Sequence, residues 1–370
     1  MKFTCAKNDL KDALQIANRA VAVKPQTPVL AGVYLRAEGS TLEMQANNFS
    51  LGIITKIGVN TEEPGAVVVG GKFFQEIVSQ LPGDTVTISF EQGDNFVNII
   101  SGASKNTMLA MSAEDFPKVK SQEVLTSFKI RPAALKNLIN RTAFACASDD
   151  ARPIFTGCLF EVNGSSITVA ATNTHRIAIQ KDKISGEVEE MSFIVPAATL
   201  RDLARMLDTT SENLVTIDYA GKYIAFIFDN IFMTSRLIEG QYPPYQKVVP
   251  ESCDMHVKVN VAEMLAAVNR VAVYSKETEY NTIRFIFTQE GLDISSTSPD
   301  VGKSEEHVAA TLEGADIDIS FNVKYISEVL NVLKSENCRI GLNKPLYPID
   351  VREESDDDYI YIVTPVRTNN

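Results

Sequence analysis

The side chains that could carry out chemistry are few in this sequence, and their spacing matches no catalytic motif. The chain holds 3 histidines, His175, His256 and His307, and contains neither HExxH nor GxSxG, the motifs that place a zinc ion or a serine nucleophile. Two acidic runs, Asp149-Asp150 and Asp356 to Asp358, could offer carboxylates to a metal ion. Neither run has a second acid held on a neighbouring apolar strand, so solvated loop charges are the favoured interpretation. We therefore predict no catalytic residue, no metal site and no cofactor.

Three other segments have unusual composition. Gly70-Gly71-Lys72 resembles the end of a phosphate-binding loop, but the GxxxxGK[ST] spacing is absent, which favours a simple turn from strand to helix. The run from Thr172 to Ile177, TNTHRI, follows an apolar strand, and a lone histidine there more often makes structural hydrogen bonds than catalyses a reaction. Tyr361 to Arg367 is apolar although it lies close to the chain end. Such a segment either completes a sheet or lines an apolar groove for a partner.

The elements that must position these residues recur three times along the chain. Alternating apolar and polar residues on both sides of a glycine predict a β-hairpin. This pattern occurs at 33–47, 158–172 and 284–298, with the turns at Gly39, Gly164 and Gly291. The recurrence predicts a repeated scaffold rather than a single catalytic cleft.

Helical patterns accompany each hairpin, one before it and one after it. Six helices are expected, at 6–24, 72–82, 131–147, 197–207, 260–277 and 323–334. Because these elements recur in the same order, we predict three domains, at 1–125, 126–252 and 253–370, each long enough for its own core.

The charge of the chain is distributed unevenly over these elements. The formal net charge is −12, yet the six expected helices carry 14 lysines and arginines against 7 acidic residues. Basic surface helices are common and could account for this count. The alternative is a basic helical layer that faces a polyanion while the strands and loops remain acidic.

Composition also limits the compartment. No apolar run approaches the ~18 residues that span a bilayer, and the N-terminal sequence MKFTCAKND lacks the apolar core of a signal peptide. The 5 cysteines, Cys5, Cys146, Cys158, Cys253 and Cys338, form no CxxC pair, and we expect them to be buried reduced thiols. These features predict a cytoplasmic protein without a membrane partner.

Several longer segments together resemble one family over essentially the whole chain. They are AEDFP at 113–117, TNTHRIA at 172–178, EGQYPPYQKVVP at 239–250, FNVKYISEVLNVL at 321–333 and YIVTPVR at 361–367. With the threefold repeat, they are similar to the bacterial DNA sliding clamp, the β subunit of DNA polymerase III.

The resemblance implies an α+β fold of three clamp domains, each with two β-sheets backed by two helices. Two chains would form a head-to-tail homodimer ring. The ring would encircle double-stranded DNA without reading its sequence and would tether the replicative polymerase without catalysing a reaction itself. Polymerase catalytic subunit, clamp loader and other partners would dock through short clamp-binding peptides. A nucleic-acid enzyme and a purely structural β-protein remain the alternatives.

The resemblance also assigns roles to residues. DNA-facing residues are expected at Lys24, Lys72, Arg141, Arg152, Arg201, Arg205 and Lys324. The expected partner-peptide groove comprises Phe155, Thr172, Thr174, His175, Arg176, Ile177, Pro243, Lys247, Val248, Pro345, Tyr347, Ile362, Val363, Thr364, Pro365, Val366 and Arg367. The expected dimer seam comprises Met108, Leu109, Val273 and Tyr274.

This chain departs from the family pattern at three groove positions. Lys247 stands where arginine is frequent, which weakens any flat guanidinium contact. Thr174 stands where glycine is common, and Thr364 where methionine is common. Both changes should alter the floor of the groove and its flexibility. In the loop from Asp149 to Ile154, which should approach DNA, Pro153 and Ile154 replace aromatic residues and disfavour stacking on single-stranded DNA.

Overall fold

A computed structural model describes residues 1–149, 151–276 and 281–367. It forms two compact units. The first comprises residues 1–132 and 205–237, and the second comprises residues 133–204 and 238–370. Asp150 of the acidic run and Glu277, the expected end of the fifth helix, lie outside the described residues.

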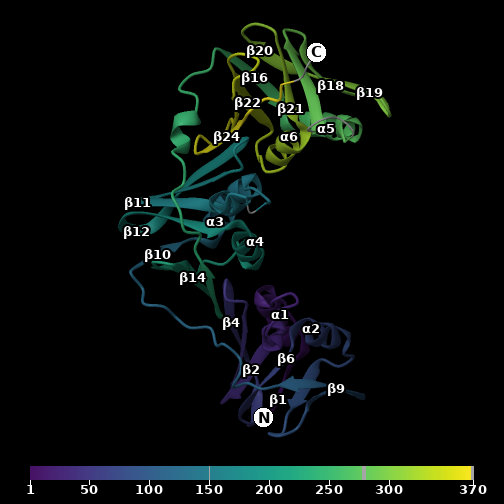
Figure 1. Cartoon of the computed structure of the whole chain (residues 1–370), viewed down its shortest axis with the longest axis vertical. Helices are drawn as coiled ribbons and strands as arrows, with labels where there is room; N and C mark the ends of the chain where they lie inside the picture. The colour runs from purple at the N-terminus through teal and green to yellow at the C-terminus, as the bar shows by residue number, and fades with distance from the viewer. Residues whose placement is uncertain (150, 277–280, 368–370) are drawn as a thin grey trace. The chain divides into compact units, whose positions relative to one another are not determined.

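The first unit contains the complete first repeat. Its strands are β1 (Lys2–Ala6), β2 (Gly32–Glu38), β3 (Thr41–Asn47), β4 (Leu51–Gly58), β5 (Asn60–Glu63), β6 (Gly65–Gly70), β7 (Thr85–Ser89), β8 (Phe96–Ser101) and β9 (Ser104–Met111). Helices α1 (Lys7–Ala17) and α2 (Gly71–Gln80) lie side by side in Figure 1. Helix α1 buries Leu10, Leu14 and Ala17 on one face, the spacing of an amphipathic helix. The β2–β3 hairpin confirms the first expected turn, and Gly39 has φ +58° there.

A continuous sheet joins the first repeat to strands of the second. These strands are β10 (Thr126–Ile130), β13 (Val215–Ala220), β14 (Tyr223–Phe228) and β15 (Ile231–Arg236). Strand β15 pairs with β4 in antiparallel register, with Ile231 opposite Thr55 and Ser235 opposite Leu51. Because this ladder crosses the boundary between the repeats, the first unit includes part of the second repeat.

The second unit is built on a larger sheet and a separate four-stranded sheet. The larger sheet contains β11 (Gly157–Thr172), β12 (Arg176–Pro196), β16 (Met255–Asn260), β20 (Ala310–Glu313), β22 (Asn337–Leu342), β23 (Ile349–Glu353) and β24 (Tyr359–Val363). The separate sheet contains β17 (Thr282–Thr288), β18 (Gly291–Ser298), β19 (Gly302–Val308) and β21 (Ile317–Asn322). The β17–β18 hairpin confirms the third expected turn, whereas β11 continues through its expected turn position with Gly164 at φ +58°.

The four remaining helices occur where the sequence predicts them. They are α3 (Pro132–Thr142), α4 (Ala197–Met206), α5 (Val261–Ser275) and α6 (Val323–Leu330). Asparagine side chains cap two of them, since Asn260 Oδ1 accepts from Glu263 N at 3.0 Å and Asn322 Oδ1 accepts from Lys324 N at 2.9 Å. Helices α5 and α6 pack against each other, as Figure 1 shows.

Candidate functional site

The TNTHRI segment is the turn that joins β11 to β12 in the second unit. Thr172 Oγ1 donates to the carbonyl of Arg176 at 2.6 Å and accepts from Thr174 N at 3.0 Å. Asn173 Oδ1 accepts from the backbone N–H groups of His175 and Arg176 at 3.1 and 3.2 Å. Short polar side chains therefore replace the missing ladder bonds and hold the turn. His175 is exposed, and its ring stacks on the Tyr325 ring with centroids 6.4 Å apart. This contact joins His175 to no acid or nucleophile with which it could act in catalysis.

The chain end runs beside this turn. Strand β24 pairs with β12, with Val363 opposite Arg176 and Ile362 opposite Ile177. Beyond the strand, Thr364 N and Thr364 Oγ1 both donate to the His175 carbonyl, at 2.9 and 3.0 Å. The next anchor is Val366 N, which donates to the Ser320 carbonyl at 2.8 Å. The structure thus brings together two expected groove segments that are far apart in sequence.

The segment around Tyr242, near the end of the second repeat, also contacts this turn. The Tyr242 ring packs edge-on against Phe155 with centroids 6.0 Å apart, and Tyr242 Oη accepts from Thr172 N at 3.1 Å. Burial raises the pKa of Tyr242 well above its usual range, so its hydroxyl stays protonated. The short helix η5 (Tyr245–Val248) follows and presents Val248, 47% exposed. Tyr242 and Ile177 both pack against the apolar cluster that contains Ile362.

The expected groove residues divide into a floor and a rim. Five side chains are buried and form the floor: Phe155, Thr172, Arg176, Ile362 and Val363. The half-buried members are Ile177, Thr364, Pro365 and Val366. The exposed members are Thr174, His175, Pro243, Lys247, Val248 and Arg367. Tyr242 is missing from the expected set, although its aromatic side chain directly before Pro243 was a signal that could have found it.

Arg176 ties the turn to the third repeat. Its Nη1 donates to Glu328 Oε2, and its Nη2 donates to the Phe144 carbonyl at 2.6 Å. The guanidinium also lies 4.5 Å from the centroid of the Tyr325 ring. Because these partners use the planar donors, Arg176 braces the floor rather than offering its charge to a ligand.

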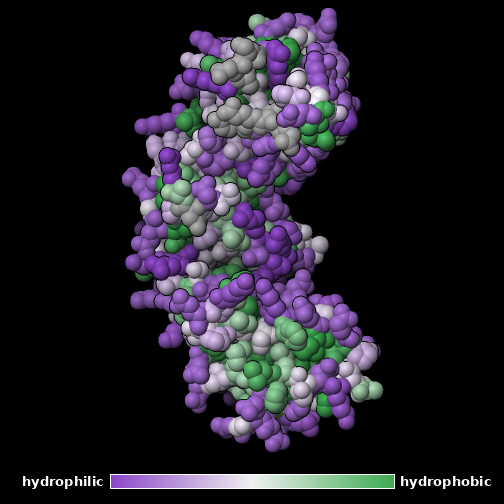
Figure 2. Space-filling view, turned by 45° about the vertical axis from the view of Figure 1, so that its right-hand side comes forward, coloured by the Kyte–Doolittle hydropathy of each residue, from purple (hydrophilic) through white to green (hydrophobic). Residues whose placement is uncertain are grey.

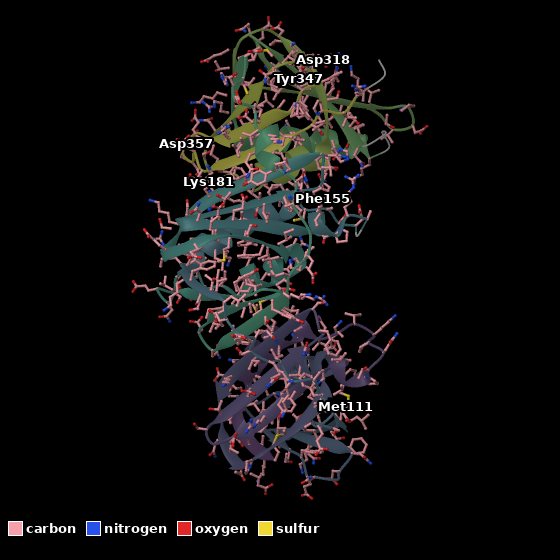
Figure 3. All side chains as sticks on the ribbon, turned by 60° about the vertical axis from the view of Figure 1, so that its left-hand side comes forward. Met111, Phe155, Lys181, Asp318, Tyr347 and Asp357 are labelled. Atoms are coloured by element: carbon pink, nitrogen blue, oxygen red, sulfur yellow. The ribbon has the colours of Figure 1, made fainter. Side chains whose placement is uncertain are left out.

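The last two expected groove residues are Pro345 and Tyr347. Both are exposed in the turn between β22 and β23, and the contacts of Tyr347 are with Lys344 of the same turn. Figure 3 shows Tyr347 well separated from Phe155. That Pro345 and Tyr347 line the groove stays a prediction.

The expected DNA-facing residues are exposed with one exception. Lys72 lies in the first turn of α2, Arg201 and Arg205 on α4, and Lys324 in the first turn of α6. Arg152 precedes the short helix η4 (Pro153–Thr156), and Lys24 lies beyond α1 with φ +52°. All six side chains are exposed.

Arg141 is the exception, because its side chain is 3% exposed. Its Nη2 lies 2.9 Å from Glu353 Oε2 and its Nη1 lies 2.8 Å from Asp356 Oδ2. The guanidinium stacks 4.0 Å from the centroid of the Tyr359 ring. This placement corrects the expectation, since a buried, paired arginine on α3 cannot contact DNA. It instead connects the second repeat to the third.

The expected seam residues alternate between core and surface. Met108 is 8% exposed and packs inside the first unit, whereas its neighbour Leu109 is 63% exposed. Leu109 lies opposite Phe96, which is also exposed, and Phe73 on α2 is a further exposed aromatic of the same unit. Figure 2 shows hydrophobic residues gathered on one face of this unit. In the second unit Val273 is exposed and Tyr274 is half-buried.

Metal binding and membrane insertion depend on other groups of residues. Within residues 1–149, 151–276 and 281–367, no group of three or more His, Cys, Asp or Glu side chains is placed to hold a metal ion. In the same residues, no helix combines the length and apolarity needed to cross a bilayer.

Comparison with known proteins gives consistent matches over the whole chain. Models for the N-terminal, central and C-terminal domains of the DNA polymerase III beta subunit match residues 1–120, 129–244 and 246–367. The beta sliding clamp of Bacillus subtilis is 30% identical, with 100% of both chains covered, and that of Synechococcus elongatus is 32% identical, with 99% covered.

Solved structures agree. The crystal structure of the DNA polymerase sliding clamp from Bacillus subtilis matches with a TM-score of 0.93 and 30% identity, covering 100% of each chain. A sliding clamp from Pseudomonas aeruginosa bound to griselimycin matches with a TM-score of 0.93 and 29% identity, again covering 100% of each chain.

Proposed function

Because the chain belongs to the DNA polymerase III beta-subunit family, we propose that it is a DNA sliding clamp. Two copies would close head to tail around duplex DNA and hold a replicative polymerase on its template, without a catalytic step of their own. The domains would be 1–125, 126–252 and 253–370, as the repeats suggest, and the compartment would be the cytoplasm. The matches to all three family domains, in order and over nearly the full length, support this proposal.

The observation that carries the proposal is the junction of the β11–β12 turn, the chain end and the segment around Tyr242. Here hydrogen bonds hold the backbone in place, and the apolar side chains of Ile177, Val248 and Val366 are exposed or half-buried. A short peptide with an apolar end fits this chemistry, since apolar contacts supply affinity and nearby backbone groups orient the chain. Lys247 and Arg367 add positive charge at the rim.

The exposed basic residues support contact with DNA. Lys24, Lys72, Arg152, Arg201, Arg205 and Lys324 are exposed in a chain whose net charge is −12. Side chains on helices and turns offer diffuse positive charge to phosphates without reading base edges. Such contacts are weak and screened by salt, which permits sliding.

The test is topological. Protein loaded by a clamp loader onto a nicked circular plasmid should remain bound through gel filtration and dissociate when the plasmid is cut once. The same loaded protein should lengthen the products of a partner polymerase on primed circular DNA. Retention on the linear plasmid, or equal product lengths with and without the protein, would contradict the proposal.

A further inference from the structure

Two buried cysteines lie side by side beneath the groove. Cys146 follows the short helix η3 (Ala143–Ala145), and Cys158 is the second residue of β11. Their sulfur atoms are 3.6 Å apart, and both residues are buried. Ala147 N donates to the Phe155 carbonyl at 2.8 Å, so a backbone hydrogen bond closes the loop that the two cysteines flank.

We propose that Cys146 and Cys158 are an oxidative modification site, at which a hydroperoxide forms an intrachain disulfide. A disulfide bond is about 2.05 Å long, so the sulfur atoms must approach by about 1.6 Å from their present separation. Side-chain rotation and a small displacement of Cys146 can supply this approach, because Cys146 lies at a bend directly after η3 while Cys158 is held in the β11 ladder.

The two thiols differ in the way that a reactive and a resolving cysteine must differ. Cys146 is 8% exposed, whereas Cys158 is fully buried. The hydrogen bond to Cys146, together with burial, raises the pKa of the Cys158 thiol well above its ordinary value. Cys158 therefore keeps its proton, and Cys146 is the sulfur that a peroxide reaches first.

The reaction balances with one peroxide per pair. The deprotonated sulfur of Cys146 attacks one peroxide oxygen, the O–O bond breaks, and the other oxygen leaves with a proton as water or an alcohol. Cys146 is then a sulfenic acid. The Cys158 sulfur attacks the Cys146 sulfur, the S–S bond forms and the S–O bond breaks, and the departing hydroxide takes the Cys158 proton to form water. The two thiols lose two electrons to the peroxide.

The modification should reach the groove through Phe155, a consequence that rests on the proposed peptide-binding function. Phe155 precedes Cys158 by three residues and packs against Tyr242, whose hydroxyl holds Thr172 N. Drawing Cys146 toward β11 displaces the Ala147–Phe155 hydrogen bond and hence the Phe155 ring. In the proposed complex, losing one aromatic contact between Phe155 and the peptide corresponds to roughly fivefold weaker peptide binding.

Mass spectrometry tests the modification itself. The purified full-length protein is treated with hydrogen peroxide, denatured in an alkylating agent, digested with a protease that cleaves between the two cysteines, and mapped. We expect a linked peptide pair containing Cys146 and Cys158, lighter than the two free peptides by two hydrogen atoms and released by dithiothreitol. Cys146→Ser and Cys158→Ser should abolish the link, whereas Cys338→Ser, which removes a buried thiol elsewhere, should preserve it. Sulfinic acid at Cys146 without the link, or both thiols alkylated after treatment, overturns the proposal.

Fluorescence anisotropy tests the effect on the groove. The probe is a fluorescein-labelled hexapeptide with an apolar Leu-Phe end, titrated with reduced, oxidised and re-reduced protein. We expect weaker binding after oxidation, recovery with dithiothreitol, and no peroxide effect in Cys158→Ser. Equal affinity of mapped oxidised protein and reduced protein overturns the coupling to the groove. If the reduced protein fails to bind the probe, the result counts against the proposed function instead. It leaves the disulfide proposal intact, because mass spectrometry detects the disulfide without the peptide.

Discussion

Replacing Thr174 with glycine should stabilise the second unit. Thr174 has φ +78°, a left-handed conformation that is unfavourable for a β-branched residue. Relief of this conformation is worth about 1–2 kcal/mol. The additional freedom of glycine in the unfolded chain opposes it by roughly 0.5–1 kcal/mol. The midpoints of these two ranges give a net gain of about 0.75 kcal/mol, or about 1.5–3 °C in the melting temperature of a unit of this size.

The backbone contacts of the turn should survive the change. Thr174 N donates to Thr172 Oγ1, and that bond does not depend on the side chain of residue 174. Scanning calorimetry of Thr174→Gly would measure the shift, with Thr168→Gly as the matched control. Thr168 lies in the extended β11 strand opposite Lys181, so glycine there should cost roughly 1 kcal/mol. If both variants lose stability equally, the left-handed backbone at Thr174 is not a source of strain and the reasoning fails.

Three further predictions concern the Arg141 ion pairs, the partner-peptide groove and the dimer seam. Arg141→Met should lower the free energy of unfolding by about 3–5 kcal/mol, because it leaves the buried Glu353 carboxylate without its charged partner, whereas Arg201→Met at an exposed site should change it little; thermal melts would distinguish the two. Deleting residues 365–367 should weaken binding of the hexapeptide probe. Because β24 ends at Val363, the far-ultraviolet circular dichroism spectrum should not change, and a loss of its β-sheet signal would contradict this prediction. Leu109→Asp should shift the solution mass from twice the chain mass toward one, as measured by analytical ultracentrifugation, and an unchanged mass would remove Leu109 from the seam.

The repeating elements follow from the amino-acid sequence alone. The six helices and the hairpins at Gly39 and Gly291 follow from local periodicity and glycine turns, which depend on residues close together in the chain. Met108 is buried and Leu109 is exposed, and this difference also follows from a local rule, since successive side chains of a strand point to opposite faces. Local patterns, however, do not state which of the two faces is covered.

Contacts between distant residues, in contrast, depend on the fold. Arg141 looks like any basic residue on a surface helix until the fold places Glu353, more than two hundred residues later, against its guanidinium. The same holds for the bond from Thr364 to the His175 carbonyl and for Tyr242 beneath Thr172. These contacts arise because strand pairing and burial bring separate segments together, and neither composition nor periodicity records the partner of a given side chain.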